Sequence, residues 1–226
     1  MRRISTIYLI VLLVTTGCTT MKDQFNKILG IEEGGTAQEL AWDGMDAYEN
    51  GKYEKAIDKF QKLKDYYPFS KYAILAELKI ADAHYQREEY EEAIFAYENF
   101  EQLHPRNEAI PYVIYQIGRC YYDQIDTTDR DQTSAQKALE AFQRLTKQFP
   151  RDQYSTRAAA HMKKAQKSLA GHAYEVGVFY YNTKHYKAAL HRFMSIISDY
   201  PDVGYHQKAL EYIAKCEASI TKEESE

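Results

Sequence analysis

The stretch "GMDAYENGKYEKAIDKFQKLKDYYP", residues 44–68, carries the pattern that decides the fold. The small residue Gly44 is followed by Ala56 twelve residues later, by Phe60 four residues further on, and by Pro68 eight residues after that. Apolar residues at a spacing of three to four on both sides of "NGKY" predict two helices joined by a short turn. The small residues would let these helices approach closely, and the proline would end the second one.

The same ladder of positions occurs four times. The other three copies end at "QLHP", "KQFP" and "SDYP", and their rungs are Ala81, Ala93, Tyr97 and Pro105; Gly118, Ala138, Phe142 and Pro150; and Gly177, Ala189, Phe193 and Pro201. A tyrosine occupies the same place at three of the turns, as Tyr53, Tyr90 and Tyr186. The ladder resembles the tetratricopeptide repeat. It implies an all-α superhelix, a right-handed solenoid of about four to five repeats with a concave face, closed by a C-terminal capping helix.

The third copy departs from the ladder at its turn. Gly118 and Ala138 are 20 residues apart rather than twelve, so eight residues are added within "QIDTTDRDQTSAQ". An exposed loop of this length would be mobile without contacts of its own. We expect Arg130 to pair with Asp129 or Asp131, or with a neighbouring helix, and so to hold the loop in one shape.

The fourth copy departs in the length of its first helix. The spacing from the preceding proline to the glycine rung is 27 residues, against 13 in the two copies before it. The added length amounts to about four helical turns. It predicts one long helix from about 153 to 183, bent near Ala170 and Gly171. A capping helix over about 203–221 and a frayed acidic tail, "TKEESE", should follow.

The N-terminus has the layout of a secretory signal. Arg2 and Arg3 are followed by an apolar run over 4–14 and then by small residues. The run is too short to span a bilayer, which takes about 20 apolar residues. Its end at a glycine and Cys18 resembles a bacterial lipoprotein signal, although Thr15 stands where such signals prefer leucine.

This second resemblance implies that residues 1–17 are removed and that Cys18 carries the lipid. A diacylated and N-acylated cysteine supplies three chains and hence a stable anchor. The residue after the cysteine directs sorting in such signals, and Thr19 implies the outer membrane. Residues 18–36 would then be the lipid anchor and a flexible tether.

Composition argues against several classes of function. Removal of the signal takes away two basic residues and no acidic one, so the formal net charge goes from −4 to −6, which disfavours nucleic acid as a partner. Cys120 and Cys216 are the two other cysteines, and we expect both to be small buried hydrophobes. The seven histidines show no HExxH spacing, and no GxSxG or phosphate loop is present. We therefore expect no enzyme, no metal site and no cofactor.

Four local segments resemble the BamD (ComL) family of outer-membrane assembly lipoproteins. They are "YYPFSKYA" at 66–73, "AIPYVIYQIGRCYYDQ" at 109–124, "DTTDRDQTSAQKALEAFQRL" at 126–145 and "FPRDQYSTRA" at 149–158. The resemblance implies a lipid-anchored scaffold on the periplasmic face of the outer membrane. The implied partners are the periplasmic domain of the barrel-forming subunit BamA, other lipoproteins of that machinery, and the C-terminal segments of nascent outer-membrane proteins.

The resemblance also assigns the two tasks to different repeats. Residues 37–107 would receive the client and residues 108–226 would dock on the barrel subunit. The 21 tyrosines exceed what a core requires, and tyrosine suits an adaptable peptide groove. The candidate groove residues are Tyr48, Phe69, Lys71, Tyr72, Lys79 and His84. The candidate docking residues are Arg130, Tyr180, Lys184, His185, Gln207 and Lys208.

Two other functions stay open at this point. A pilotin-like lipoprotein, which escorts a secretin or pilus component, is also built from these repeats but should lack the long turn at 126–134. A cell-envelope coordinator, which couples peptidoglycan synthesis to membrane constriction, would carry an N-terminal coiled coil. Residues 19–36 are too short to form one.

Overall fold

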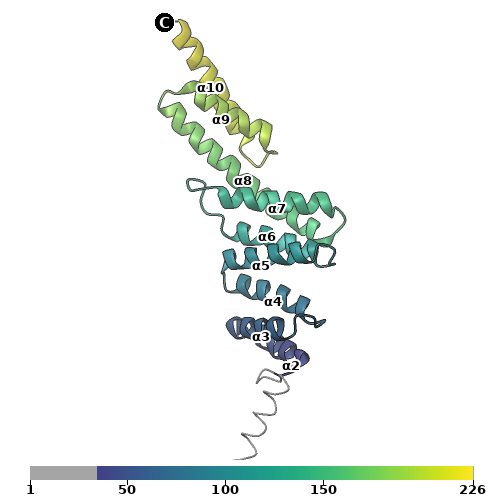
Figure 1. Ribbon diagram of the computed structural model, residues 1–226. Coiled ribbons are helices and arrows are strands. Elements are labelled where there is room, and N and C mark those ends of the chain that lie inside the picture. The colour runs from purple at the N-terminus through teal and green to yellow at the C-terminus, as the bar shows by residue number, and fades with distance from the viewer. Residues whose placement is uncertain (1–34, 226) are drawn as a thin grey trace, which may run out of the picture. The chain divides into compact units, whose positions relative to one another are not determined.

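The computed structural model describes residues 35–225, so the predicted signal, Cys18 and most of the tether lie outside the described residues. Within that range the protein consists of α-helices and contains no strand, as expected (Figure 1). The helices are α2 (Ala37–Glu49), α3 (Tyr53–Tyr66), α4 (Ala73–Gln86), α5 (Tyr90–Leu103), α6 (Ile110–Asp123), α7 (Thr133–Gln148), α8 (Gln153–Asn182), α9 (Tyr186–Asp199) and α10 (His206–Ser225).

The helices pack on their neighbours in chain order. Helix α2 packs on α3, α6 on α7, α8 on both α7 and α9, and α9 on α10. The all-α fold of the tetratricopeptide-repeat type with a C-terminal helix is thereby confirmed. The chain forms two compact units that divide between Ala83 and His84. The functional division between residues 107 and 108 stays a prediction.

Each described glycine rung lies against the aromatic ring of its own repeat. A Cβ added to Gly44 would lie 2.5 Å from the ring of Phe60, and one added to Gly118 would lie 2.5 Å from the ring of Phe142. In the fourth copy, Gly177 of α8 and Phe193 of α9 make the same contact. The sequence pattern relates the glycine to the alanine twelve residues later. The structure shows that the glycine also leaves room for the aromatic ring, because any side chain at the glycine position would collide with that ring.

The aromatic rungs of the third and fourth copies also reach the helix that follows their own pair. The ring of Phe142 stacks on His161 of α8, with ring centres 5.6 Å apart. The ring of Phe193 stacks on Tyr212 of α10 at 4.8 Å. Both phenylalanines are completely buried. One side chain in each of these copies therefore fixes the helix pair and its successor together.

Three turns within repeats have the same backbone shape. Gly51, Glu88 and Lys184 occupy the same place in "NGKY", "REEY" and "TKHY", and their φ angles are 70°, 61° and 64°. The following residue in each turn donates its backbone N–H to a carbonyl in the last turn of the preceding helix, at 2.8 to 3.0 Å. This αL ending satisfies carbonyls that the helix leaves unpaired. It is costly for residues with a side chain.

The eight added residues form a loop between α6 and α7 that packs on α8. The ring nitrogen Nδ1 of His172 donates to the backbone carbonyl of Thr128 at 2.7 Å. The Thr128 hydroxyl in turn donates to the carboxylate of Glu175. Two residues of α8 therefore hold the first half of the loop.

Gln132 holds the second half of the loop. Its amide nitrogen donates to the backbone carbonyls of Thr127 and Arg130, each at 3.0 Å. Its amide oxygen accepts from the hydroxyl of Ser168, a buried residue of α8, at 2.7 Å. The loop therefore has one shape that its own side chains specify.

The expected ion pairs of Arg130 were wrong. Its Nε lies 3.3 Å from the carboxylate of Asp126, and its side chain is 69% exposed. Asp131 instead accepts hydrogen bonds at the start of α7. An exposed pair contributes about 0 to 1 kcal/mol. The loop is therefore held by its hydrogen bonds to α8 and not by this arginine.

Helix α8 is the long helix that the spacing predicted. Its N-cap is Asp152, whose carboxylate accepts the backbone N–H of Tyr154 at 2.8 Å, and the helix runs for 30 residues from Gln153 through Ala170 and Gly171 without a break. The small residue at 171 has a packing reason. A Cβ there would lie 2.7 Å from the Thr128 methyl group and 2.8 Å from the hydroxyl of Tyr205.

The expected end of the last helix was wrong. Helix α10 continues to Ser225, so residues 221–225 are helical and do not form a frayed tail. Near this end, Glu224 lies 3.0 Å from Lys187 of α9. The helix packs along α9 through the buried Cys216. Cys120 and Cys216 are both unpaired and buried, as expected.

Candidate binding surfaces

The predicted client groove includes Lys79 and Tyr48, which the structure brings together. The Lys79 ammonium lies 2.8 Å from the carboxylate of Asp82 and 4.8 Å from the centre of the Tyr48 ring. Asp82 is only 2% exposed, and a buried carboxylate needs a partner. Lys79 is therefore a structural cation, which makes it a poor candidate for binding a client carboxylate.

Phe69, Lys71 and Tyr72 lie in the turn between α3 and α4. Phe69 is fully exposed, whereas Tyr72 is half-buried and packs against the core of the first unit. The Lys71 ammonium lies 5.0 Å from the centre of the Tyr72 ring. The turn therefore presents one apolar ring and one cation outward. Tyr72 packs on the core and supports the turn that carries Phe69 and Lys71.

Further exposed apolar residues flank this turn in the sequence. Tyr66, Ile74 and Leu75 are between 38% and 48% exposed, and they belong to the end of α3 and the first turn of α4. The single tryptophan, Trp42 of α2, is 68% exposed. Exposed apolar groups of this size favour an interaction surface.

His84, the last candidate for the groove, belongs to the second unit. Its Nδ1 lies 2.7 Å from the carboxylate of Glu89, which also contacts Arg87 at 2.8 Å. These three residues close the turn between α4 and α5. The contacts of His84 are therefore local ones.

The predicted docking residues fall into three places. Tyr180 and His185 lie together at the turn between α8 and α9, with ring centres 6.2 Å apart, and Lys184 is the αL residue of that turn. Gln207 and Lys208 are exposed in the first turn of α10, where the Lys208 ammonium lies 5.9 Å and 5.7 Å from two tyrosine rings, those of Tyr174 and Tyr205. Arg130 lies in the inserted loop.

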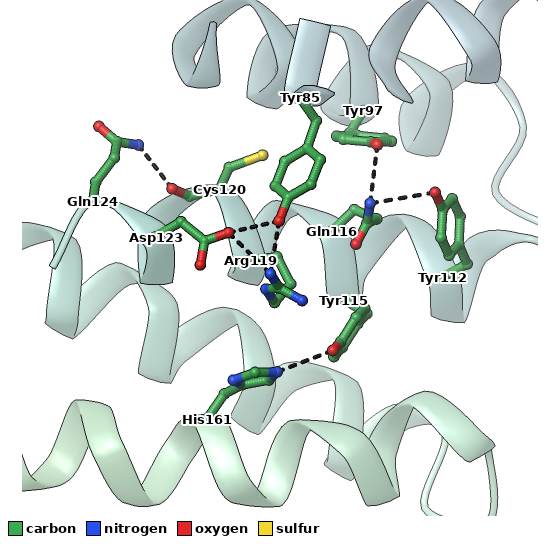
Figure 2. A network of polar contacts seen from close by, with 10 residues as sticks. All are labelled: Tyr85, Tyr97, Tyr112, Tyr115, Gln116, Arg119, Cys120, Asp123, Gln124 and His161. Carbon is green, nitrogen blue, oxygen red and sulfur yellow. Dashed lines mark hydrogen bonds and ion pairs between the residues drawn. The ribbon is translucent and has the colours of Figure 1, made fainter. Parts of the chain in front are cut away.

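A polar network that the sequence analysis missed links α4, α6 and α8 (Figure 2). The Tyr85 hydroxyl donates to the Asp123 carboxylate at 2.6 Å and accepts from Arg119 Nη2 at 2.8 Å. Arg119 also contacts Asp123 at 3.1 Å, while its Nε is buried without a hydrogen-bond partner. Burial and the bond to Asp123 raise the pKa of Tyr85. Burial opposes the charge of Arg119, but Tyr115, Tyr85 and Asp123 together raise its pKa.

His161 forms the α8 side of this network. Its Nε2 lies 3.0 Å from the Tyr115 hydroxyl, and its ring packs on Tyr122 and Phe142. Figure 2 shows His161 and Tyr115 pointing toward one another from neighbouring helices. Burial, followed by the positive charge of Arg119, lowers its pKa, although Asp123 acts in the opposite direction. These surroundings therefore disfavour protonation of His161.

Two further residues of α6 complete the network. Gln116 Nε2 donates to the hydroxyls of Tyr97 at 3.4 Å and Tyr112 at 3.3 Å. Burial raises the pKa of the Cys120 thiol to about 12, so this cysteine is not a nucleophile. These polar groups hold neighbouring helices in register. They do not form a nucleophile–base pair.

One local signal could have indicated this network. Arg119 and Asp123 are four residues apart in "GRCYYD", a spacing that places an ion pair on one helix face. Tyr85 and His161 lie 34 residues before and 42 residues after Arg119. No sequence pattern in a single chain joins positions at those distances.

Residues 35–225 contain no group of three or more His, Cys, Asp or Glu side chains that could hold a metal ion. None of the helices in this range has the length and apolar character needed to cross a membrane.

Residues 34–226 match the family YfiO, described as outer membrane lipoprotein. The chain belongs to the YfiO family. The resemblance to the BamD family is thereby confirmed, because two similar proteins carry that name.

Two curated relatives are both called outer membrane protein assembly factor BamD. The one from Caulobacter vibrioides is 29% identical over 167 residues, which cover 74% of this chain and 55% of the relative. The one from Neisseria meningitidis is 27% identical over 208 residues, which cover 88% of this chain and 78% of the relative. The YfiO-family chain thus spans about half the length of the Caulobacter relative. Among solved structures, the tetratricopeptide-repeat domain of P58(IPK) is similar at 18% identity over 81% of this chain and 46% of that one, with a TM-score of 0.49.

Proposed function

We propose that this chain is an assembly factor for outer-membrane proteins that acts by binding other proteins and not by catalysis. The observation that carries the proposal is the family match over residues 34–226. The repeat fold supports it, because stacked repeats present side chains that their own packing does not use. The groups with raised or lowered pKa values in the polar network serve to hold helices together, which supports a scaffold rather than an enzyme.

The client surface is the turn between α3 and α4. An outer-membrane protein that ends in an aromatic residue and a free carboxylate needs an apolar wall and a cation. Phe69 and Lys71 supply both groups at an exposed position. Lys79 supports the fold through Asp82 and takes no direct part.

Docking on the periplasmic domain of BamA uses the α8–α9 turn and the start of α10. Tyr180, His185 and Lys208 present rings and a cation there, and charged contacts of this kind depend on salt. The lipid on Cys18 holds the scaffold at the periplasmic face of the outer membrane. Other lipoproteins of the same machinery complete the set of partners.

Co-purification from detergent-solubilised envelopes tests the function. We expect BamA to elute with the tagged chain, and a secretin in its place would show a pilotin-like escort instead. Lys208→Glu should release BamA. Lys215→Glu is the matched control, because Lys215 belongs to the same helix and, like Lys208, lies over a tyrosine ring. Its ammonium is 4.6 Å from the centre of the Tyr212 ring. Equal loss of BamA in both variants, or in neither, would contradict the docking site.

The anchor has its own test. Cys18→Ser should leave a folded chain that no longer sediments with the outer membrane. Circular dichroism checks the fold and fractionation checks the location. A variant that still sediments with the outer membrane at normal yield would show that the lipid is dispensable.

A further inference from the structure

A cavity of about 420 Å³ lies on the second unit, and none of its lining residues belongs to the client or docking surfaces proposed above. One wall is α5, with Glu91, Phe95 and Glu98. The opposite wall is the end of α6 and the start of α7, with Tyr121 and Lys137. The inserted loop closes one side through Asp131. The loop that distinguishes this chain from a plain repeat therefore also builds a cavity.

The α5 wall has a regular arrangement. Glu91, Phe95 and Glu98 are spaced by four and three residues, so they share one face of the helix. Phe95 is 67% exposed, which is more than a core position allows. Neither glutamate forms an ion pair within residues 35–225. This wall therefore offers an exposed ring with a carboxylate on each side.

The opposite wall shows what the cavity attracts. The Lys137 ammonium lies 5.1 Å from the centre of the Tyr121 ring, so a cation from the chain itself already rests on an aromatic face here. The residues that line the cavity include three carboxylates, those of Glu91, Glu98 and Asp131, and one ammonium group, that of Lys137. The cavity is therefore negative overall and has aromatic groups on both walls.

The loop side of the cavity is fixed before any partner arrives. Asp131 accepts the hydroxyl of Thr133 at 3.0 Å, and Gln132 next to it is bonded to Ser168 of α8. A partner would not need to order this side on binding, which lowers the cost of association.

We propose that this cavity binds an arginine side chain in an extended, positively charged segment of a partner protein. A guanidinium can stack on the Phe95 ring while it donates paired hydrogen bonds to Glu91 or Glu98, a combination that an ammonium group cannot match. The apolar residue beside the arginine packs on Ile94, which also lines the cavity. The site stands on its own contacts and does not depend on the proposed function.

A short fluorescent peptide tests the proposal. The probe is Gly-Arg-Leu-Arg-Gly, the full chain is kept in detergent, and binding is followed by fluorescence anisotropy at low salt. We expect saturable binding that weakens as salt is added. The same peptide with citrulline in place of arginine keeps the shape but lacks the charge, and it should not bind. Equal binding of both peptides, or no binding of the arginine peptide, would overturn the proposal.

Variants assign the binding to this cavity. Glu91→Gln with Glu98→Gln should weaken binding about tenfold or more, and Phe95→Ala should also weaken it. The matched control is Glu54→Gln with Glu217→Gln, which changes the net charge equally at exposed positions outside the cavity. Lys137→Met should strengthen binding several-fold, because it removes the resident cation, and damage to the fold cannot produce such a gain. Equal effects of the cavity and control pairs, or weaker binding by Lys137→Met, would overturn the proposal.

Discussion

Gly118 and Phe142 lie so close together that a methyl group cannot fit between them. A Cβ on Gly118 would be 2.5 Å from ring atom Cε1 of Phe142. The ring cannot move aside easily, because it is completely buried and packs against Tyr115 and His161. The pair therefore sets the distance between α6 and α7.

Gly118→Ala should destabilise the protein by about 1 to 3 kcal/mol, as expected for overpacking in a core. Chemical denaturation measures this loss. Phe142→Leu in the same chain should recover part of it, since the smaller side chain leaves room for the methyl group, and a double-mutant cycle reports the coupling. A Gly118→Ala protein as stable as the parent would show that the two helices can separate without cost.

Glu88→Gly should stabilise the protein, because Glu88 has a φ of 61°. A side chain in the left-handed region costs about 1 to 2 kcal/mol, part of which glycine gives back through its freedom in the unfolded chain, so a net gain of about 0.5 to 1 kcal/mol is expected. Gln86→Gly, two residues earlier in the last turn of α4, is the control and should destabilise. A loss of stability in both variants would contradict the strain at residue 88.

Lys184→Gly separates stability from docking at the matching turn. The φ of Lys184 is 64°, so glycine should again stabilise by about 0.5 to 1 kcal/mol. If the lysine also contacts BamA, the same variant should bind BamA less well in co-purification. A more stable protein that retains all its BamA would remove Lys184 from the docking surface.

The sequence predicted the repeats well because their cause is local. Glycine, alanine, aromatic and proline residues recur at fixed spacings, and helix packing uses those spacings directly. The long α8 followed from counting residues. The end of α10 did not, because the acidic tail lacks an apolar pattern, whereas in the structure residues 221–225 continue the helix and Glu224 contacts Lys187.

Side-chain partners were harder to predict from the sequence. Arg130 has acidic neighbours on both sides, yet its ion pair forms with Asp126, four residues earlier in the loop. The residues that hold the loop, Gln132 and Ser168, are 36 residues apart and carry no charge. Lys79 looked available for a client because its partner Asp82 is buried only after folding.

Lowering the pH should destabilise the protein through His161. Its pKa is lowered by burial and then by Arg119, with Lys164 acting in the same direction and Asp123 against it. The unfolded histidine has a pKa of about 6.5. The unfolded chain therefore binds more protons near and below that pH, and stability is lost as the pH falls.

His161→Phe keeps an aromatic ring against Phe142 and removes the titrating group. Between about pH 7 and pH 5, its free energy of unfolding should fall less than that of the parent. Urea denaturation at several pH values measures this difference. His191→Phe is the control, since His191 is exposed on α9. Parallel pH profiles for parent and His161→Phe would contradict the lowered pKa of this histidine.

Gln132→Ala should loosen the inserted loop, whereas Arg130→Ala should not. Removing Gln132 leaves the buried Ser168 hydroxyl without its acceptor, which costs about 1 to 3 kcal/mol. Arg130 loses only an exposed pair worth about 0 to 1 kcal/mol. Hydrogen exchange of residues 125–132, together with melting temperature, measures both effects. Faster exchange in Arg130→Ala than in Gln132→Ala would return the loop-holding role to the arginine.

Peptide binding and protein stability, compared at four positions, separate the residues that contact the client from those that support the fold. Phe69→Ala should weaken capture of a C-terminal barrel peptide by about 1 to 3 kcal/mol with little change in melting temperature, because the ring is fully exposed. Lys71→Met should also weaken capture, and adding salt should reduce the difference from the parent. These two residues provide the wall and the cation of the proposed site.

The other two positions should behave in the opposite way. Lys79→Met leaves the Asp82 carboxylate buried without its cation and should lower the melting temperature strongly. Tyr72→Ala removes a ring that packs on the core of the first unit and should also destabilise. Peptide affinity, measured at a temperature where each variant is folded, should then stay near that of the parent. If Lys79→Met is stable and fails to capture the peptide, Lys79 meets the client carboxylate and the site lies on α4 instead of the turn before it.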